Sequence, residues 1–85
     1  MKSFKYTIKD SLGIHARPAG LLVKAAAKFQ SKITLSGNGK SADIKRLLAV
    51  MSLGIKCGVE VEISAEGPDE DAACAALADF FEANL

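Results

Sequence analysis

The residues best suited to chemistry lie in Gly13–Ala19, which reads Gly-Ile-His-Ala-Arg-Pro-Ala and contains the only histidine of the chain, His15. Pro18 lacks a backbone N–H and fits only the first turn of a helix, so we expect a helix to begin at or next to His15. The amides of Ala16 and Arg17 would then lack acceptors within the helix and point towards the imidazole ring. Arg17 also supplies a permanent cation whose geometry suits phosphate. The motif therefore has the components of an anion-binding site.

This combination predicts that His15 accepts a phosphoryl group. Only a neutral imidazole has the free electron pair that attacks phosphorus, and an ordinary imidazole is mostly neutral at pH 7. The motif contains no pair of carboxylates, no metal cluster and no base that could activate water, so the group would be stored and passed on. A single histidine in a loop is more often a solvated surface residue, and only its neighbours favour the carrier.

Hydrophobic spacing predicts the elements that position this motif. Strands alternate polar and apolar residues, helices repeat apolar residues every three or four positions, and Gly-Asn-Gly at 37–39 is typical of a hairpin turn. These patterns predict strands around 4–8, 32–35, 40–43 and 59–65, and helices around 16–29, 45–53 and from 69 onward. The order βαββαβα indicates a two-layer α+β domain, an antiparallel sheet covered by helices on one side.

The second and third of these helices differ in how their apolar residues are arranged. Segment 45–53 is apolar around most of its circumference, so we expect part of its surface to face a partner. Acidic residues at 69–71 suit the first turn of the last helix, because negative charge stabilises a helix N-terminus. We expect the inward stripe of that helix to consist of Ala73, Ala76, Leu77 and Phe80.

Length and composition restrict the class of protein. Eighty-five residues, of which 25% are charged, form one domain, residues 1–85, rather than a disordered tail. No apolar run reaches the roughly 18 residues of a membrane span, and the first residues do not resemble a signal peptide. We therefore expect a cytoplasmic monomer without a cofactor. Cys57 and Cys74 lack CxxC spacing, which argues against a zinc site and predicts two small buried thiols rather than a disulfide.

Charge is divided along the chain. Residues 1–59 hold all 11 basic groups and two acidic ones, a net charge of +9, whereas residues 60–85 hold eight acidic groups and no basic one. We expect this division to persist in space, and a basic portion favours an acidic protein surface, a phosphate or a nucleic acid as partner. The only tyrosine is Tyr6, and basic and aromatic residues are not interleaved, so a nucleic-acid-binding module is the weaker alternative.

With these motifs the chain resembles HPr, the histidine-containing phosphocarrier family of the bacterial phosphoenolpyruvate-dependent sugar phosphotransferase system. Gly13–Ala19 matches the active-site signature of the family, Val50–Ile55 resembles its second signature, and Gly67–Glu70 is similar to the start of its last helix. The resemblance covers essentially the whole chain. It implies an open-faced sandwich, in which a four-stranded antiparallel sheet of strand order 1-4-2-3 carries three helices on one face.

The resemblance also implies roles for individual residues. His15 would accept phosphate at Nδ1 from phosphorylated enzyme I and pass it to a histidine of enzyme IIA. Arg17 would balance the phosphate charge, and the amides of Ala16 and Arg17 would hold the phosphate oxygens. The resemblance further implies a partner-docking patch with a basic rim, which corresponds to Leu47, Leu48, Met51, Lys24, Lys45 and Arg46. The alternatives are that the apolar residues pack in the core and that the lysines are simply solvated.

The chain departs from the family pattern at two positions. Arg46 occupies the position at which many members carry a serine that a regulatory kinase phosphorylates, and Ser52 lies on the same helix at a position expected to be inward or capping. Leu12 replaces a small polar residue near the phosphohistidine, and nothing in the sequence shows that Ser11 takes over its hydrogen bond. These departures leave the carrier role intact and argue against regulation through serine.

Two further functions would use the same histidine. A regulatory member of the family, such as one in a nitrogen-type branch, would retain His15 and bind different partners. An enzyme such as a phosphatase would use His15 as its nucleophile, but the sequence has no evident second catalytic group and 85 residues leave little room for a substrate pocket. The carrier is therefore the function that the sequence favours.

Arg46 has no hydroxyl group, so we expect the serine kinase of the family, supplied with ATP, not to phosphorylate this protein at that position. Arginine adds a positive charge where a phosphoserine would add about −1.5 to −2. The Arg46→Ser variant should regain the acceptor hydroxyl for the kinase. Phosphoserine analysis of both proteins is the measurement, and stoichiometric labelling of the wild type, at Ser52 or elsewhere, would refute the expectation.

Overall fold

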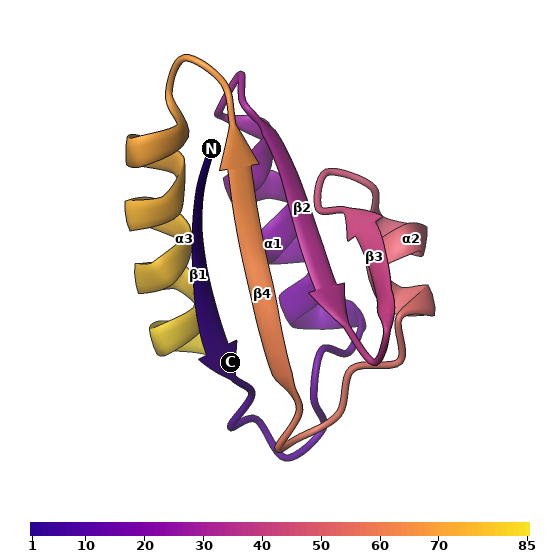
Figure 1. The fold of residues 1–85 in the computed structure, drawn as a ribbon. Coiled ribbons are helices and arrows are strands. Elements are labelled where there is room, and N and C mark those ends of the chain that lie inside the picture. Colours follow the sequence, from indigo (N-terminus) through magenta and orange to yellow (C-terminus); the bar gives the residue numbers. More distant parts are fainter.

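The computed structural model describes residues 1–85 and contains seven helices and strands, in the order that the sequence predicts. They are β1 (Lys2–Thr7), α1 (Ala16–Ala27), β2 (Lys32–Gly37), β3 (Lys40–Asp43), α2 (Leu47–Ser52), β4 (Glu60–Glu66) and α3 (Glu70–Asn84). The strands form one antiparallel sheet in the order β1-β4-β2-β3, and the helices lie on one face of it (Figure 1). The predicted α+β class and the implied strand order are confirmed. None of the helices has the length and hydrophobicity to cross a membrane.

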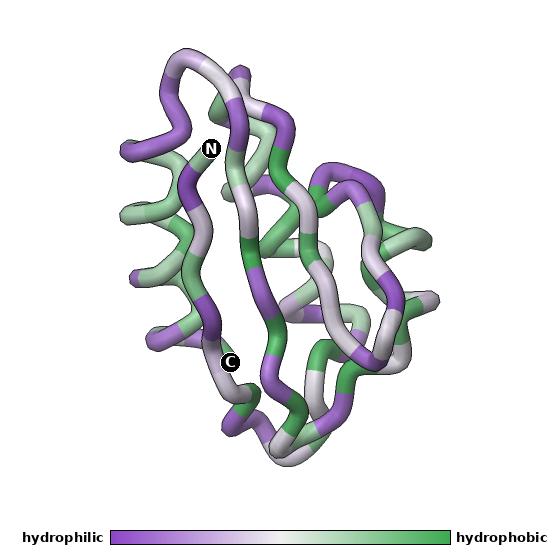
Figure 2. The backbone as a smooth tube through the Cα atoms, in the orientation of Figure 1, coloured by the Kyte–Doolittle hydropathy of each residue, from purple (hydrophilic) through white to green (hydrophobic).

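Strand β4 alternates between the core and solvent. Its apolar residues are buried and the acidic residues between them are exposed, an alternation visible along the strand in Figure 2. Glu62 is paired with Lys5 of β1 and Ser36 of β2, and Glu66 is paired with Lys32. The expected separation of positive and negative charge in space is therefore wrong for the sheet, because the acidic strand lies between two strands that carry lysines.

Nineteen buried apolar residues form one core between the sheet and the helices. The predicted stripe of α3 is wrong at Ala76, which is exposed, whereas Phe80 is half-buried and packs against the edge of the core. Adjacent alanines and phenylalanines allow two stripes to fit the helical spacing, and packing of the Phe81 ring against Phe4 and Tyr6, at centroid distances of 6.2 and 5.5 Å, selects one of them. The buried residues of α3 are Ala73, Cys74, Leu77 and Phe81.

Helices α1 and α2 are both shorter than their apolar spacing predicts. Helix α1 ends before Phe29, which packs half-buried against the core. Helix α2 begins only at Leu47, because Asp43 accepts hydrogen bonds in a turn from the amides of the two residues just before the helix. Its carboxylate accepts from the Lys45 amide at 2.9 Å, and its carbonyl accepts from the Arg46 amide at 3.0 Å. These turn hydrogen bonds replace the first turn of the predicted helix.

The hairpin between β2 and β3 has the predicted turn. Asn38 and Gly39 both adopt positive φ angles, 55° and 74°, as a two-residue turn of this kind requires. The side-chain amide of Asn38 donates to the carbonyls of Leu53 and Gly54, each at 3.1 Å. The turn therefore also fastens the C-terminal end of α2 to the sheet.

The loop that leads into α1 is pressed against the segment that leads into β4. Gly13 has a φ of 69°, and a Cβ atom there would lie 2.3 Å from the carbonyl oxygen of Ile55. The amide of the next residue, Ile14, donates to this same oxygen at 3.0 Å. Only glycine permits this backbone conformation together with so close an approach. The contact fixes the position of the loop that leads into α1.

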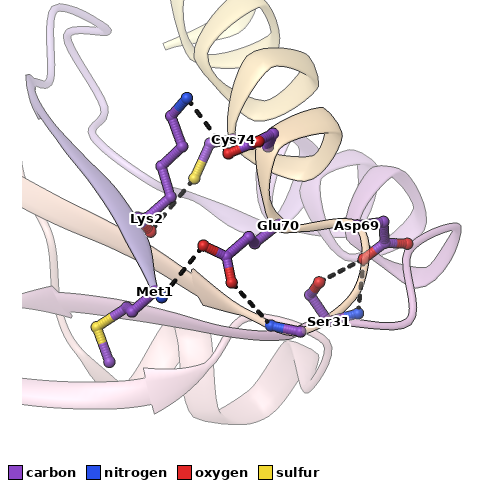
Figure 3. Close-up of polar contacts among 8 residues, drawn as sticks. Met1, Lys2, Ser31, Asp69, Glu70 and Cys74 are labelled. Atoms are coloured by element: carbon purple, nitrogen blue, oxygen red, sulfur yellow. Dashed lines mark hydrogen bonds and ion pairs between the residues drawn. The ribbon is translucent and has the colours of Figure 1, made fainter.

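The Asp69 carboxylate joins the loop between α1 and β2 to the start of α3, and Figure 3 shows its contacts with Ser31. The two oxygens of Asp69 accept from the amides of Gln30, at 2.8 Å, and Ser31, at 2.9 Å, and from the hydroxyl of the buried Ser31. The hydrogen bond from the Ser31 hydroxyl, followed by that from the Gln30 amide, lowers the pKa of Asp69. The ionised carboxylate therefore stabilises the folded chain.

The two cysteines lie in different environments, and both are free thiols. Cys74 is buried as predicted, its Sγ lies 3.4 Å from the carbonyl oxygen of Lys2 (Figure 3), and burial raises the pKa of its thiol. The prediction is wrong for Cys57, which is exposed because it lies in the surface turn before β4.

We expect Asp69→Asn to lower the thermal unfolding midpoint at pH 7. The amide keeps one acceptor oxygen for Ser31 but replaces the other with a group that cannot accept from Gln30. Because folding lowers the pKa of Asp69, its stabilisation is present above the unfolded pKa, near 3.9, and is lost as the pH falls through the folded pKa. The difference from wild type should therefore narrow in acid. Asp79→Asn, an exposed change on the same helix, is the control, and equal midpoints at pH 7 for wild type and Asp69→Asn would contradict the account.

We expect Gly13→Ala to lower the free energy of unfolding by about 2–4 kcal/mol, because the methyl group strains the backbone and overlaps Ile55. Gly20→Ala is the matched control. Gly20 lies within α1, and an added Cβ there meets no atom within 4 Å, so this variant should gain about 0.5–1 kcal/mol. Urea unfolding measures both changes, and two shifts of the same sign would show that the Gly13 contact has no such role.

Candidate functional site

The site is centred on the N-terminus of α1, where His15 is the N-cap residue, as expected. Its backbone is extended, with φ −96° and ψ −179°, and its carbonyl accepts the first helical hydrogen bond from the Ala19 amide at 3.0 Å. Pro18 has no amide hydrogen, and the amides of Ala16 and Arg17 donate to no acceptor within the protein. Two free donors at the positive end of a helix dipole, next to an imidazole, can bind an anion.

A carboxylate also reaches the imidazole ring. Asp10 begins a turn in which its carbonyl accepts from the Gly13 amide at 2.9 Å and its Oδ1 accepts from the Leu12 amide at 2.8 Å. Its other oxygen, Oδ2, lies 3.6 Å from Nε2 of His15. At this separation the two groups are at ion-pair distance rather than hydrogen-bonded, and the imidazole makes no capping hydrogen bond.

Sequence reasoning missed Asp10, because this residue lies outside the Gly13–Ala19 motif to which the predicted chemistry was assigned. The absence of carboxylates holds for the motif itself but not for the folded site. A signal was present in the sequence, since an aspartate at the start of a glycine-containing turn often accepts a hydrogen bond from the backbone amide two residues further on, which is an Asx turn. That signal predicts the turn, but only the fold brings the second oxygen to the histidine.

The imidazole and Arg17 open onto one shallow depression of about 310 Å³. Arg17 is exposed and forms no ion pair, so its guanidinium is available to an anion. Asn84, at the end of α3, completes the rim and donates its side-chain amide to the Phe80 carbonyl. Two larger depressions, one along the sheet and one between the sheet and α2, include neither His15 nor Arg17. The depression at the start of α1 is lined by Asp10, His15, Arg17, Pro18, Leu21 and Asn84.

Helix α2 packs beside α1 (Figure 1). Part of its apolar surface is exposed. Val50 points into the core, whereas Leu48 is 81% exposed, Leu47 is 40% exposed and Met51 is 39% exposed. Core packing therefore does not account for these three side chains, and the expectation that this surface faces a partner stays a prediction. Ser52 is not inward: it is exposed, and its hydroxyl donates to the Ala49 carbonyl at 2.7 Å.

The three basic residues of the predicted rim differ in their contacts. The ammonium group of Lys45 donates to the carbonyl oxygen of Phe29 at 2.6 Å, just beyond the C-terminal end of α1. Lys24 and Arg46 are exposed and form no ion pair. Lys45 therefore has a structural contact that the sequence did not reveal, while the other two cations are free to meet a partner.

Comparisons with known proteins identify the family. A sequence model described as the PTS HPr component phosphorylation site matches residues 2–83. The histidine-containing phosphocarrier protein of a mycoplasma is 42% identical, with a TM-score of 0.91 over 93% of this chain and 90% of that one. An HPr of Thermoanaerobacter tengcongensis is 43% identical, with a TM-score of 0.93 over 98% of this chain and 93% of that one.

A further similar structure concerns the oligomeric state. Crh, a catabolite repression protein of Bacillus subtilis, is 34% identical, with a TM-score of 0.78 over 100% of this chain and 98% of that one, and forms a swapped dimer. The monomer expected for this chain therefore stays a prediction. The family match spans all four strands and the start of α1, in agreement with the fold described above. The chain belongs to the HPr family of phosphocarrier proteins of the phosphotransferase system.

Proposed function

We propose that His15 accepts a phosphoryl group from phosphorylated enzyme I and passes it to a histidine of enzyme IIA. The observation that carries this proposal is the pair of unbonded amides of Ala16 and Arg17, which directly follow the only histidine of the chain. A helix N-terminus whose first donors have no acceptor is suited to bind phosphate oxygens.

The transfer needs few groups from this chain. The lone pair of the neutral imidazole attacks phosphorus, and the bond between phosphorus and the donor histidine breaks with its electrons remaining on the donor nitrogen. The amides of Ala16 and Arg17 and the guanidinium of Arg17 then bind the phosphoryl oxygens. Because this charge is held at an exposed helix end, a second protein can approach and remove the group. These features support a carrier.

We propose that partner proteins contact the exposed side of α2 beside the site. Leu47, Leu48 and Met51 offer apolar area, and Lys24 and Arg46 add positive charge near it. An apolar centre with a charged rim is the usual composition of a transient interface. Lys45 contributes less to this rim, because its ammonium is bonded to the Phe29 carbonyl.

We expect His15→Ala to abolish phosphorylation by enzyme I and phosphoenolpyruvate while the fold persists. The imidazole makes no capping hydrogen bond, so its removal should change the free energy of unfolding by no more than about 1 kcal/mol. Arg17→Ala should slow the transfer by about one to two orders of magnitude without abolishing it. Detection of an acid-labile, base-stable phosphoadduct is the measurement, and full labelling of His15→Ala would exclude the carrier function.

We expect Met51→Glu to weaken binding to enzyme I about tenfold, which corresponds to about 1.4 kcal/mol, because a carboxylate would have to enter an apolar contact. Higher salt should weaken binding of the wild type as well, since screening shortens the reach of surface charges to about 8 Å at physiological ionic strength. Ala76→Glu, which adds the same charge to the exposed side of α3, is the control. Equal affinities for the two variants would place the docking surface elsewhere.

A further inference from the structure

Asp10 is held more firmly than a surface carboxylate usually is. Its amide donates to the main-chain oxygen of Leu85 at 2.9 Å, its carbonyl accepts from Gly13, and its Oδ1 accepts from Leu12. Its side chain is 26% exposed, and that of His15 is 34% exposed. The backbone on both sides and one carboxylate oxygen are thus engaged, which leaves Oδ2 directed at Nε2 of the imidazole at 3.6 Å.

The turn alone does not require that second oxygen. Asp43 forms the same local contact, since its Oδ1 accepts from the amide two residues on, Lys45, at 2.9 Å. No histidine or other cation lies at ion-pair distance from its carboxylate. The placement of Oδ2 beside His15 is therefore a feature of the site rather than a consequence of the turn.

We propose that Asp10 is a positioning residue, which holds the imidazole of His15 in the tautomer with its proton on Nε2. An ionised carboxylate only accepts hydrogen bonds, so the nitrogen that faces it must carry the proton. A neutral ring has one such proton, and Nδ1 therefore keeps the lone pair. This inference rests on the proposed carrier function, and it identifies the residue that would keep Nδ1, the nitrogen implied by the family resemblance, free of its proton.

The same contact serves the transfer step. When Nδ1 forms its bond to phosphorus, the bond between phosphorus and the donor nitrogen breaks, and its electron pair stays on the donor. The proton on Nε2 does not move, so the ring of His15 gains positive charge as it gains the phosphoryl group. The Asp10 carboxylate faces that charge, and a separation of 3.6 Å without phosphate can shorten to a hydrogen bond as the charge develops.

The tautomer can be measured directly in the full chain. The chain contains one histidine, so the ring ¹⁵N signals of a histidine-labelled sample belong to His15 alone. At a pH where the ring is neutral, we expect the form protonated on Nε2 to predominate in the wild type. In Asp10→Asn the amide oxygen should stay on the Leu12 amide and the NH₂ group should face Nε2. The NH₂ group and a protonated Nε2 are both donors and cannot hydrogen-bond to each other, so the population should shift to the form protonated on Nδ1.

The rate of phosphorylation gives the second readout, with phosphoramidate as a small donor that needs no partner protein. If the reactive tautomer falls to about a tenth of the molecules, the rate should fall about tenfold. Asp43→Asn is the matched control, because it makes the same change in the same kind of turn without a histidine beside it. It should leave the tautomer and the rate unchanged.

The outcomes separate this inference from the carrier function. A wild type protonated mainly on Nδ1, or an Asp10→Asn protein with the wild-type tautomer and rate, would overturn the role of Asp10, whether or not His15 carries phosphate. The predicted tautomer shift without labelling of any protein by enzyme I or phosphoramidate would instead uphold the positioning contact and reject the carrier. The wild-type spectrum requires no variant, so the inference remains testable if Asp10→Asn does not fold.

Discussion

The close approach of two backbones at Gly13 is the constraint on which the site depends. A side chain at this position would overlap the carbonyl of Ile55, and that carbonyl also accepts from the Ile14 amide. The chain therefore reaches His15 along one path, and Pro18 restricts the helix to a start at this point. The close contact at Gly13 and the hydrogen bond from Ile14 hold the loop immediately before the imidazole and the two free amides.

Helix α1 is bonded at one end and left open at the other. Beyond its C-terminal end, the Phe29 carbonyl accepts from the Lys45 ammonium, and the amides of Gln30 and Ser31 donate to Asp69. Its N-terminal end has two amides with no acceptor. Because Ala16 and Arg17 are exposed, these donors can bond to water, and they suit a site that must bind and release an anion. The contacts with Asp69 and Lys45 fasten the helix without occupying the end that the proposed chemistry uses.

Local patterns in the sequence were sufficient for most of the fold. The hairpin turn follows from the positive φ angles that Asn38 and Gly39 tolerate, and the start of α1 follows from the missing amide hydrogen of Pro18. Patterns failed where two arrangements satisfy the same spacing, as with Phe80 and Phe81, because only packing against β1 distinguishes them. The docking role of α2 was suggested by its apolar circumference, and the structure adds that its apolar side chains are exposed.

The features that escaped prediction are contacts between segments that no local pattern connects. The Lys45 ammonium reaches Phe29 across 16 positions, and the acidic β4 lies between two strands that come much earlier in the chain. Asp10 and His15 are only five positions apart, but their contact depends on the turn that reverses the chain between them. Such contacts follow from the path of the backbone, which a single sequence does not specify residue by residue.

The most direct test of the account is a comparison of backbone amide ¹H–¹⁵N spectra before and after phosphorylation of the chain. If the phosphoryl group is bound at the start of α1, the amides of Ala16 and Arg17 should show the largest downfield shifts, because they become hydrogen-bond donors to its oxygens. Residues of β2 and β3 should change little. Unchanged amides at 16 and 17 in a fully phosphorylated protein would contradict the central claim that this helix end holds the phosphate.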